Sequence, residues 1–210
     1  MQKLLGNLKK GLIFVISAPA GTGKTTLTHK LVDEFPCVIQ NISCTTRIPR
    51  ENETEGDHYH FLSREEFEKK IRLGEFLEYV KVYEDYYGTP IRWIEEQQNQ
   101  GKHVVLVIDT QGAMQVKKRC QATSVFILPP SLEALRNRLI ERGTESDEDI
   151  ERRLAWAKHE MKVATIYDYL IINDNLDIAY QALRSLVIAE EHRKSAFQFL
   201  NDTTNGIAND

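Results

Sequence analysis

The residues best suited to chemistry lie in a glycine-bearing loop near the start of the chain. This loop comprises Ala18, Pro19, Ala20, Gly21, Thr22, Gly23, Lys24, Thr25 and Thr26. Glycines let backbone N–H groups close around phosphate oxygens, and a helix that begins at the loop adds partial positive charge to the full charge of Lys24. Because an apolar run precedes the loop and an amphipathic stretch follows it, the sequence predicts a P-loop that binds a nucleoside triphosphate, with the Thr25 hydroxyl on Mg²⁺.

Ala18 departs from the usual P-loop pattern, which has glycine at this position. An alanine fits the loop only where its φ angle is negative, so we expect a negative φ at Ala18. The alternative interpretation is a glycine-rich turn that merely exposes a lysine. The sequence Gly23-Lys24-Thr25 between a strand and a helix disfavours that alternative.

Alternating strands and helices must position this loop. This alternation predicts an α/β fold with a parallel sheet flanked by helices, as a single domain. Its core is expected to comprise residues 11–41, 94–136 and 157–193. Buried strands are predicted at residues 12–17, 103–108, 124–128 and 169–172, and helices at 24–35 and from near Gln111, Ser131 and Asn175.

Two segments interrupt that alternation. Residues 42–93 are predicted to form an inserted subdomain, with a capping box at 63–66 that starts a helix through Leu73, a strand at 76–83, and a helix between Thr89-Pro90 and Gly101. Residues 137–156 are predicted to form a small helical lid with a mobile hinge at 143–146. Residues 201–210 lack apolar periodicity and are expected to be disordered.

The charge composition gives no general attraction to nucleic acids or anionic membranes. The chain has 27 Lys and Arg against 31 Asp and Glu, a net charge of −4, so any phosphate binding must be local. Cys37, Cys44 and Cys120 are widely spaced, which predicts reduced thiols rather than disulfides or a zinc site. No apolar run approaches the roughly 18–20 residues that span a bilayer. We therefore expect a cytoplasmic protein without nucleic-acid or membrane partners.

Six motifs beyond the P-loop resemble the guanylate kinase family in their order and spacing. They occupy residues 43–50, 56–59, 76–78, 86–89, 108–112 and 141–145, and the resemblance covers about residues 11–193. It implies a P-loop kinase core with a GMP-binding insertion and a lid. It also implies ATP- and Mg²⁺-dependent phosphorylation of GMP, and of dGMP, in purine nucleotide metabolism.

Binding of the acceptor phosphate requires positive charge and hydrogen-bond donors. Arg47 and Arg50 flank Pro49, which favours an extended backbone, and two guanidinium groups can bind a phosphate bidentately. The family resemblance implies that Arg47, Arg50, Tyr59 and Tyr87 hold the phosphate of GMP. The alternatives are a solvated basic loop for the arginines and core packing for the tyrosines.

Recognition of guanine requires acceptors for its N1–H and its exocyclic amine, and carboxylates provide them. The resemblance implies that Glu78 and Asp109 bind this edge, with hydroxyl contacts from Ser43 and Thr89. A buried carboxylate that faces the wrong base loses its partner, which favours selectivity. The alternatives are a polar strand face for Glu78, an N-cap before Pro90 for Thr89, and a cap at a strand-to-helix turn for Asp109.

Phosphoryl transfer requires cations that neutralise the negative charge spreading over the moving group. The resemblance implies that Arg138, Arg142 and Arg153 act from the lid, with Lys24 as the central cation, and that Asn173 lies beside the adenine of ATP. No general base is needed, because the phosphate of GMP is already anionic at neutral pH. Arginines near a helix end also complement the helix dipole, which is the alternative for Arg138 and Arg142.

A second departure from the family pattern is Val107, where many members have an acidic residue. Glu53 matches another acidic family position and is a candidate substitute for the missing carboxylate.

Three other functions compete with a guanylate kinase. A kinase for a different monophosphate is disfavoured by the set of Glu78, Asp109 and Ser43. A guanylate-kinase-like module that binds phosphorylated partners without chemistry is disfavoured by the intact P-loop. A nucleic-acid-binding ATPase is disfavoured by the acidic net charge. The sequence leaves the oligomeric state open.

Overall fold

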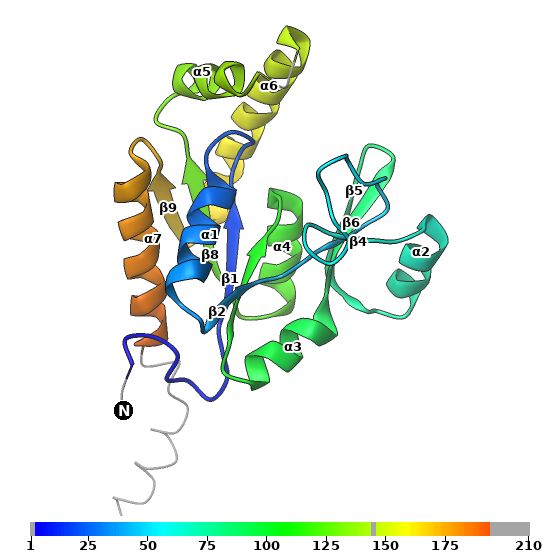
Figure 1. The fold of residues 1–210 in the computed structure, drawn as a ribbon, viewed down its shortest axis with the longest axis vertical. Coiled ribbons are helices and arrows are strands. Elements are labelled where there is room, and N and C mark those ends of the chain that lie inside the picture. Colours follow the sequence, from blue (N-terminus) through cyan, green and yellow to red (C-terminus); the bar gives the residue numbers. More distant parts are fainter. Residues whose placement is uncertain (1–2, 144–145, 194–210) are drawn as a thin grey trace, which may run out of the picture.

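A five-stranded parallel sheet forms the centre of the molecule and confirms the predicted fold class (Figure 1). The structure is a computed structural model and describes residues 3–143 and 146–193. The strand order β2-β7-β1-β8-β9 places β1 in the middle, where Val15 pairs with Leu106 on one side and Ser124 on the other. These strands are β1 (Ile13–Ser17), β2 (Val38–Gln40), β7 (His103–Val107), β8 (Thr123–Leu128) and β9 (Tyr169–Ile172). The four predicted strands are present, whereas β2 at the edge was not predicted as a strand.

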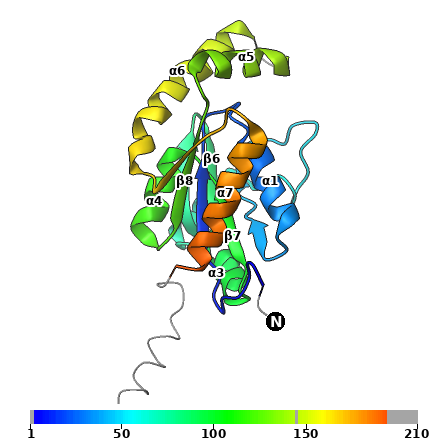
Figure 2. The ribbon, with the colours of Figure 1, turned by 90° about the vertical axis from the view of Figure 1, so that its left-hand side faces the viewer.

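Helices cover both faces of this sheet, as Figure 2 shows. Phe14 and Ile16 of β1 pack in one apolar cluster with α1 and α7, and Ile13 and Val15 pack in a second with α3 and α4. Successive strand residues point to opposite faces, so a strand buried on both faces is apolar throughout. None of the described helices combines the length and apolar character that crossing a membrane requires. The covering helices are α1 (Lys24–Glu34), α3 (Ile91–Asn99), α4 (Thr110–Arg119) and α7 (Leu176–Glu191).

The insertion contains a second sheet of four strands, in the order β4-β3-β6-β5, beside α2 (Arg64–Arg72). Its small core is aromatic: Phe67 stacks on Phe76 and Tyr86, with ring centroids 4.4 and 5.3 Å apart. The predicted strand at 76–83 ends one residue early, because Tyr83 has a φ of 55° and begins the turn into β6. The strands are β3 (Cys44–Thr45), β4 (His60–Phe61), β5 (Phe76–Val82) and β6 (Asp85–Pro90).

The helix starts of the insertion agree only in part with the sequence. The capping box of α2 is confirmed, since Ser63 Oγ accepts a bond from Glu66 N at 3.2 Å and Glu66 Oε2 accepts one from Ser63 N at 2.9 Å. Pro90, and not Thr89, is the N-cap of α3. The N-cap interpretation of Thr89 is therefore wrong.

Two helices, α5 (Leu132–Arg142) and α6 (Asp147–Val163), stand beyond the P-loop end of the sheet (Figure 1). They pack on each other through an apolar cluster that includes Leu135, Leu139, Ile150 and Leu154. The predicted lid, 137–156, consists of the second part of α5 and the first part of α6. A short 3-10 helix, η1 (Ala164–Ile166), follows α6. Residues 144–145 of the predicted hinge and the predicted tail lie outside the described residues.

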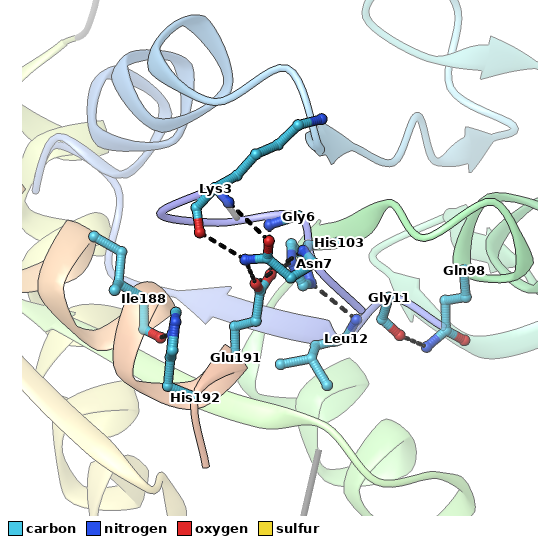
Figure 3. Close-up of polar contacts among 10 residues, drawn as sticks. All are labelled: Lys3, Gly6, Asn7, Gly11, Leu12, Gln98, His103, Ile188, Glu191 and His192. Carbon is cyan, nitrogen blue, oxygen red and sulfur yellow. Dashed lines mark hydrogen bonds and ion pairs between the residues drawn. The ribbon is translucent and has the colours of Figure 1, made fainter. Parts of the chain in front are cut away.

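Hydrogen bonds attach the amino-terminal segment to the end of α7 (Figure 3), at the opposite end of the sheet from the P-loop (Figure 1). The buried Glu191 accepts hydrogen bonds from Gly6 N at 2.6 Å, Asn7 N at 3.0 Å, Asn7 Nδ2 at 2.8 Å and His103 Nε2 at 2.6 Å. His103 Nδ1 accepts from Leu12 N at 3.0 Å, so Nε2 carries the ring proton and the ring is neutral. Burial lowers the pKa of His103. We call these five residues the amino-terminal clasp.

Candidate active site

The P-loop joins the carboxyl end of β1 to α1, as predicted. Gly21 and Gly23 have φ angles of 90° and 85°, a region that favours glycine. Thr22 closes the loop, because its hydroxyl donates to Pro19 O at 2.7 Å. No side chain caps α1, so the amides of its first turn remain available to an anion. Tyr83 is the only non-glycine residue with a positive φ among those described, which confirms the negative φ predicted for Ala18.

A cavity of about 390 Å³ lies beside the P-loop, and its volume suits a small-molecule ligand. The buried Asn173 lines it and donates from Nδ2 to Thr22 O at 2.7 Å. Arg138 reaches across from α5 and donates to Asp174 O at 3.2 Å. Asn173 and Arg138, both predicted on the ATP side, therefore line one cavity. Its lining comprises Gly21, Gly23, Arg138, Glu141, Asn173, Asp174 and Leu176.

The charges of two carboxylates act on Lys24. Burial lowers the pKa of Lys24, and the charges of Glu160 and Asp109 oppose that shift. Burial also raises the pKa of Glu160 to about 7, which the charge of Lys24 opposes. Glu160 was missed by the sequence analysis, although it stands three residues after Ala157 on the otherwise apolar face of α6. A glutamate at an apolar helix position was the available signal.

Three of the four residues predicted to bind guanine lie on or next to the adjacent strands β3, β6 and β5 of the insertion. Glu78 of β5 pairs in register with Thr89 of β6, and Cys44 pairs with Gly88, which places Ser43 beside Thr89. The Thr89 hydroxyl donates to Glu78 Oε1 at 2.5 Å, and both side chains are buried. Burial raises the pKa of Glu78 to about 7, and the charge of Asp109 adds to the rise.

Asp109 approaches this group from the core. It is the N-cap of α4, where its Oδ1 accepts a hydrogen bond from Gly112 N at 2.8 Å. The capping interpretation of Asp109 is therefore confirmed. Its charge also acts on Glu78 and on Lys24. Asp109 can therefore cap α4 and belong to the candidate site at the same time.

The residues predicted to bind the acceptor phosphate form a second group. Arg47 donates from Nε to Tyr87 Oη at 3.1 Å, lies over the Tyr59 ring at 5.6 Å, and forms an ion pair with Glu53 at 2.8 Å. The other Glu53 oxygen accepts from Arg50 N at 2.9 Å. The hydrogen bond to Glu53 raises the pKa of Arg47, and the same bond lowers that of Glu53.

This geometry corrects the expectation for Glu53. Both of its carboxylate oxygens are engaged on the arginine loop, so Glu53 does not replace the carboxylate missing at Val107. Glu160 is the additional carboxylate whose charge acts on Lys24, and burial together with the charge of Asp109 raises the pKa of Glu160.

The predicted lid arginines lie on α5 and α6. Arg153 and Glu160 are seven residues apart on α6 and therefore share one helix face. Arg142 is the last residue of α5, and its side chain lies outside the described part of the structure.

Thr25 and its surroundings fit the predicted Mg²⁺. Its side chain is exposed at the start of α1, one residue after Lys24. Hydroxyl and carboxylate oxygens are the ligand type that Mg²⁺ prefers, with nucleotide phosphates and water supplying the rest. Asp109 and Glu160 provide such carboxylates near Lys24.

Comparisons with known proteins agree with one another. The family model described as guanylate kinase matches residues 10–190. The guanylate kinase of Protochlamydia amoebophila is 60% identical over 190 residues, which cover 90% of this chain and 96% of that protein. That of Symbiobacterium thermophilum is 46% identical over 188 residues, 89% of each chain. The crystal structure of guanylate kinase from Anaplasma phagocytophilum superposes with a TM-score of 0.73 at 32% identity, covering 88% of each chain.

Proposed function

The chain belongs to the guanylate kinase family and transfers the terminal phosphoryl group of ATP to GMP, and we propose that the residues assembled above perform this transfer. GMP would lie between the insertion, 42–93, and α4. ATP would lie on the P-loop beneath the lid, 137–156. The phosphates of the two substrates would then meet at Lys24, the central cation of the site.

The observation that carries the guanine assignment is the buried group of Glu78 and Thr89 facing the α4 N-terminus. Guanine offers two donors on one edge, and the carboxylates of Glu78 and Asp109 are acceptors with compatible chemistry. The Thr89 hydroxyl occupies one oxygen of Glu78 at 2.5 Å, which fixes the direction in which the other points. Adenine has a ring nitrogen acceptor where guanine has N1–H, so it leaves a buried carboxylate without a donor.

In the transfer, each group of residues has a separate task. Arg47 and Arg50 would hold the acceptor phosphate, while Tyr59 and Tyr87 orient the Arg47 guanidinium through the contacts described above. Arg138, Arg142 and Arg153 would close on the triphosphate and exclude water. Thr25 would hold Mg²⁺, which neutralises charge on the phosphates when bound. Asn173 would keep the P-loop in shape from the ATP side.

Finer parts of the function are also proposals. GMP and dGMP share the base and the phosphate to which residues are assigned above, so dGMP is proposed as a second acceptor, within purine nucleotide metabolism. Cys37, Cys44 and Cys120 are free thiols, which supports a cytoplasmic location. The negative net charge of −4 supports small-molecule substrates over nucleic-acid or membrane partners.

The test is ADP formation by the purified chain from ATP and Mg²⁺ with GMP, dGMP, AMP, UMP, dTMP or no acceptor. We expect strong stimulation by GMP and dGMP only. Stimulation by AMP or a pyrimidine nucleotide would overturn the guanine assignments. Folded protein that binds GMP without turnover would overturn the catalytic roles and favour a binding module.

A further inference from the structure

Gly112 of α4 lies where the two carboxylates of the proposed guanine site converge. Its N–H donates to Asp109 Oδ1 at 2.8 Å. On its other side, a Cβ added at Gly112 would lie 2.6 Å from Glu78 Oε2 and 3.0 Å from Glu78 Cδ. Only a residue without a side chain leaves room for the Glu78 carboxylate against the first turn of α4.

We propose that Gly112 is a positioning residue that sets the direction of the Glu78 carboxylate and its spacing from Asp109, and thereby the selectivity for guanine. The inference rests on the proposed guanine site. Gly112 would touch neither substrate; it would act through Glu78, whose Oε2 approaches its α-carbon. Backbone strain does not explain the glycine, since Gly112 lies within regular α-helix and has no positive φ.

Hydrogen bonds hold β5, the strand that carries Glu78, against α4. Gln115 of α4 donates to Tyr79 O at 2.7 Å and accepts from Tyr79 N at 3.3 Å. Arg119, one turn further, donates to Phe76 O at 2.9 Å and to Leu77 O at 2.8 Å. These four bonds hold the β5 backbone on the core on both sides of Glu78. A methyl group at position 112 would therefore be relieved by rotation of the Glu78 side chain and not by movement of the strand.

That rotation would remove Glu78 from the base site and would also break its buried hydrogen bond with Thr89, a cost that the helix preference of alanine partly offsets. The atom in closest approach is the end of a flexible side chain, and alanine is a better helix former than glycine by about 1 kcal/mol. The Gly112→Ala variant is therefore expected to fold. Its Glu78 carboxylate, however, would point away from the hydroxyl of Thr89 and from the position assigned to the base.

The experiment measures the dissociation constants of GMP and AMP for the wild-type chain, Gly112→Ala, Glu78→Ala and the double variant. We expect Gly112→Ala to weaken GMP binding about 10- to 100-fold, the effect of losing one charged hydrogen bond, while AMP binding changes less than twofold. In the Glu78→Ala background, Gly112→Ala should have almost no further effect. Lys118→Ala, an exposed change on the same helix, is the matched control.

Three outcomes separate the possibilities. An equal loss of GMP binding from Gly112→Ala with and without Glu78 would mean a general disturbance of the helix, and it would overturn the inference. Unchanged GMP binding in Gly112→Ala, where Glu78→Ala weakens it, would overturn the inference and leave the guanine site intact. Unchanged GMP binding in Glu78→Ala would instead overturn the guanine site itself. A cooperative thermal unfolding transition of Gly112→Ala would confirm that the variant folds.

Discussion

The hydroxyl of Thr89 donates a 2.5 Å hydrogen bond to Glu78 Oε1, across neighbouring antiparallel strands and out of contact with solvent. Because the Thr89 hydroxyl holds one oxygen of this buried carboxylate, the position of the other oxygen is defined. The bond therefore prepares Glu78 to receive a donor from one direction before any substrate is present. The base-recognition prediction below depends on this preparation.

Removing both carboxylates of the base site should relax the choice of base. In the variant Glu78→Ala/Asp109→Asn, asparagine retains the capping bond to Gly112 N, because an Asn oxygen caps a helix as well as Asp does. We expect the ratio of kcat/KM for GMP over AMP to fall about 100-fold or more, since each lost charged hydrogen bond accounts for roughly tenfold. Steady-state ADP formation measures both values.

Asp109→Asn alone and the exposed Glu65→Ala change in the same insertion are the controls. If the double variant kept the wild-type preference for GMP, base selectivity would have to come from other residues.

The pH dependence of GMP binding should report on Glu78. Burial raises the pKa of Glu78 from 4.5 to about 7 in the free protein, and guanine requires the ionised carboxylate. GMP affinity should therefore be full above about pH 8 and decline as the pH falls through 7 toward 6. Calorimetric titration across that range measures the decline. The phosphate of GMP also loses charge near pH 6, so Glu78→Gln, which cannot titrate, provides the baseline.

A wild-type profile identical to that of Glu78→Gln would contradict a titration of Glu78 that is coupled to GMP binding in this range. The same raised pKa also affects folding. The folded state binds the proton more tightly than the unfolded state, so this group lowers stability as the pH rises from 4.5 to 7. Replacing Glu78 with glutamine should accordingly raise the midpoint of urea unfolding more at pH 8 than at pH 5.

Much of the sheet was predictable because its strands are continuous apolar runs. Residues 12–17 and 103–108 are buried on both faces, and such a pattern in a chain of alternating strands and helices permits few arrangements. The six-residue β6 was missed, although it pairs with the neighbouring β5. The short strands β2, β3 and β4 were also missed. They have two or three residues each, and their pairing depends on partners distant in sequence.

The site was predictable where a local motif carries the chemistry. The P-loop is local, and so is the pair of arginines around Pro49. Glu160 and Gly112 belong to no local motif. Their roles depend on residues distant in sequence: the charge of Glu160 on α6 acts on Lys24, and Gly112 on α4 leaves room for Glu78. The partner of Glu53 was also unpredictable from spacing, since only the folded loop brings both of its oxygens to the arginine segment.

Replacing Lys24 should separate chemistry from acceptor binding. In Lys24→Ala the P-loop backbone keeps its two left-handed glycines and its Thr22 bond, but the central cation is lost. We expect kcat to fall at least about 1000-fold, because a preorganised charge at the transferring group commonly contributes that much, while the dissociation constant of GMP changes less than threefold. Rapid-quench kinetics and GMP titration measure the two quantities.

Lys30→Ala is the control for the loss of a lysine from α1. Lys30 lies on the same helix but forms an ion pair with Asp177 of α7. Turnover of Lys24→Ala within tenfold of the wild type would remove Lys24 from its assigned role.

The amino-terminal clasp should contribute stability without contributing to catalysis. Glu191, whose side chain is buried, accepts four hydrogen bonds, and the bond from His103 is itself buried. Glu191→Ala would leave the buried His103 Nε2 without an acceptor and would also remove the acceptor of the part-buried donors on Gly6 and Asn7. We expect the free energy of unfolding to fall by about 3 kcal/mol, measured by urea denaturation. The clasp lies at the amino ends of the strands, whereas the P-loop and Asp109 follow their carboxyl ends, so kcat at 25 °C should stay within twofold.

The pH dependence of the stability lost in Glu191→Ala is a sharper test of the clasp than the size of that loss. Burial alone would raise the pKa of Glu191, but the hydrogen bonds from Gly6, Asn7 and His103 lower it below its ordinary value. Its stabilisation is therefore present above pH 4.5 and is lost as the pH falls through the lowered value. The stability difference between the wild type and Glu191→Ala should shrink as the pH falls below 4.5, where His103, whose pKa is lowered from 6.5 and which Glu191 also affects, no longer dominates the change. The exposed Glu95→Ala change should show no such trend, and a difference that grew as the pH fell below 4.5 would contradict an ionised Glu191 in the clasp.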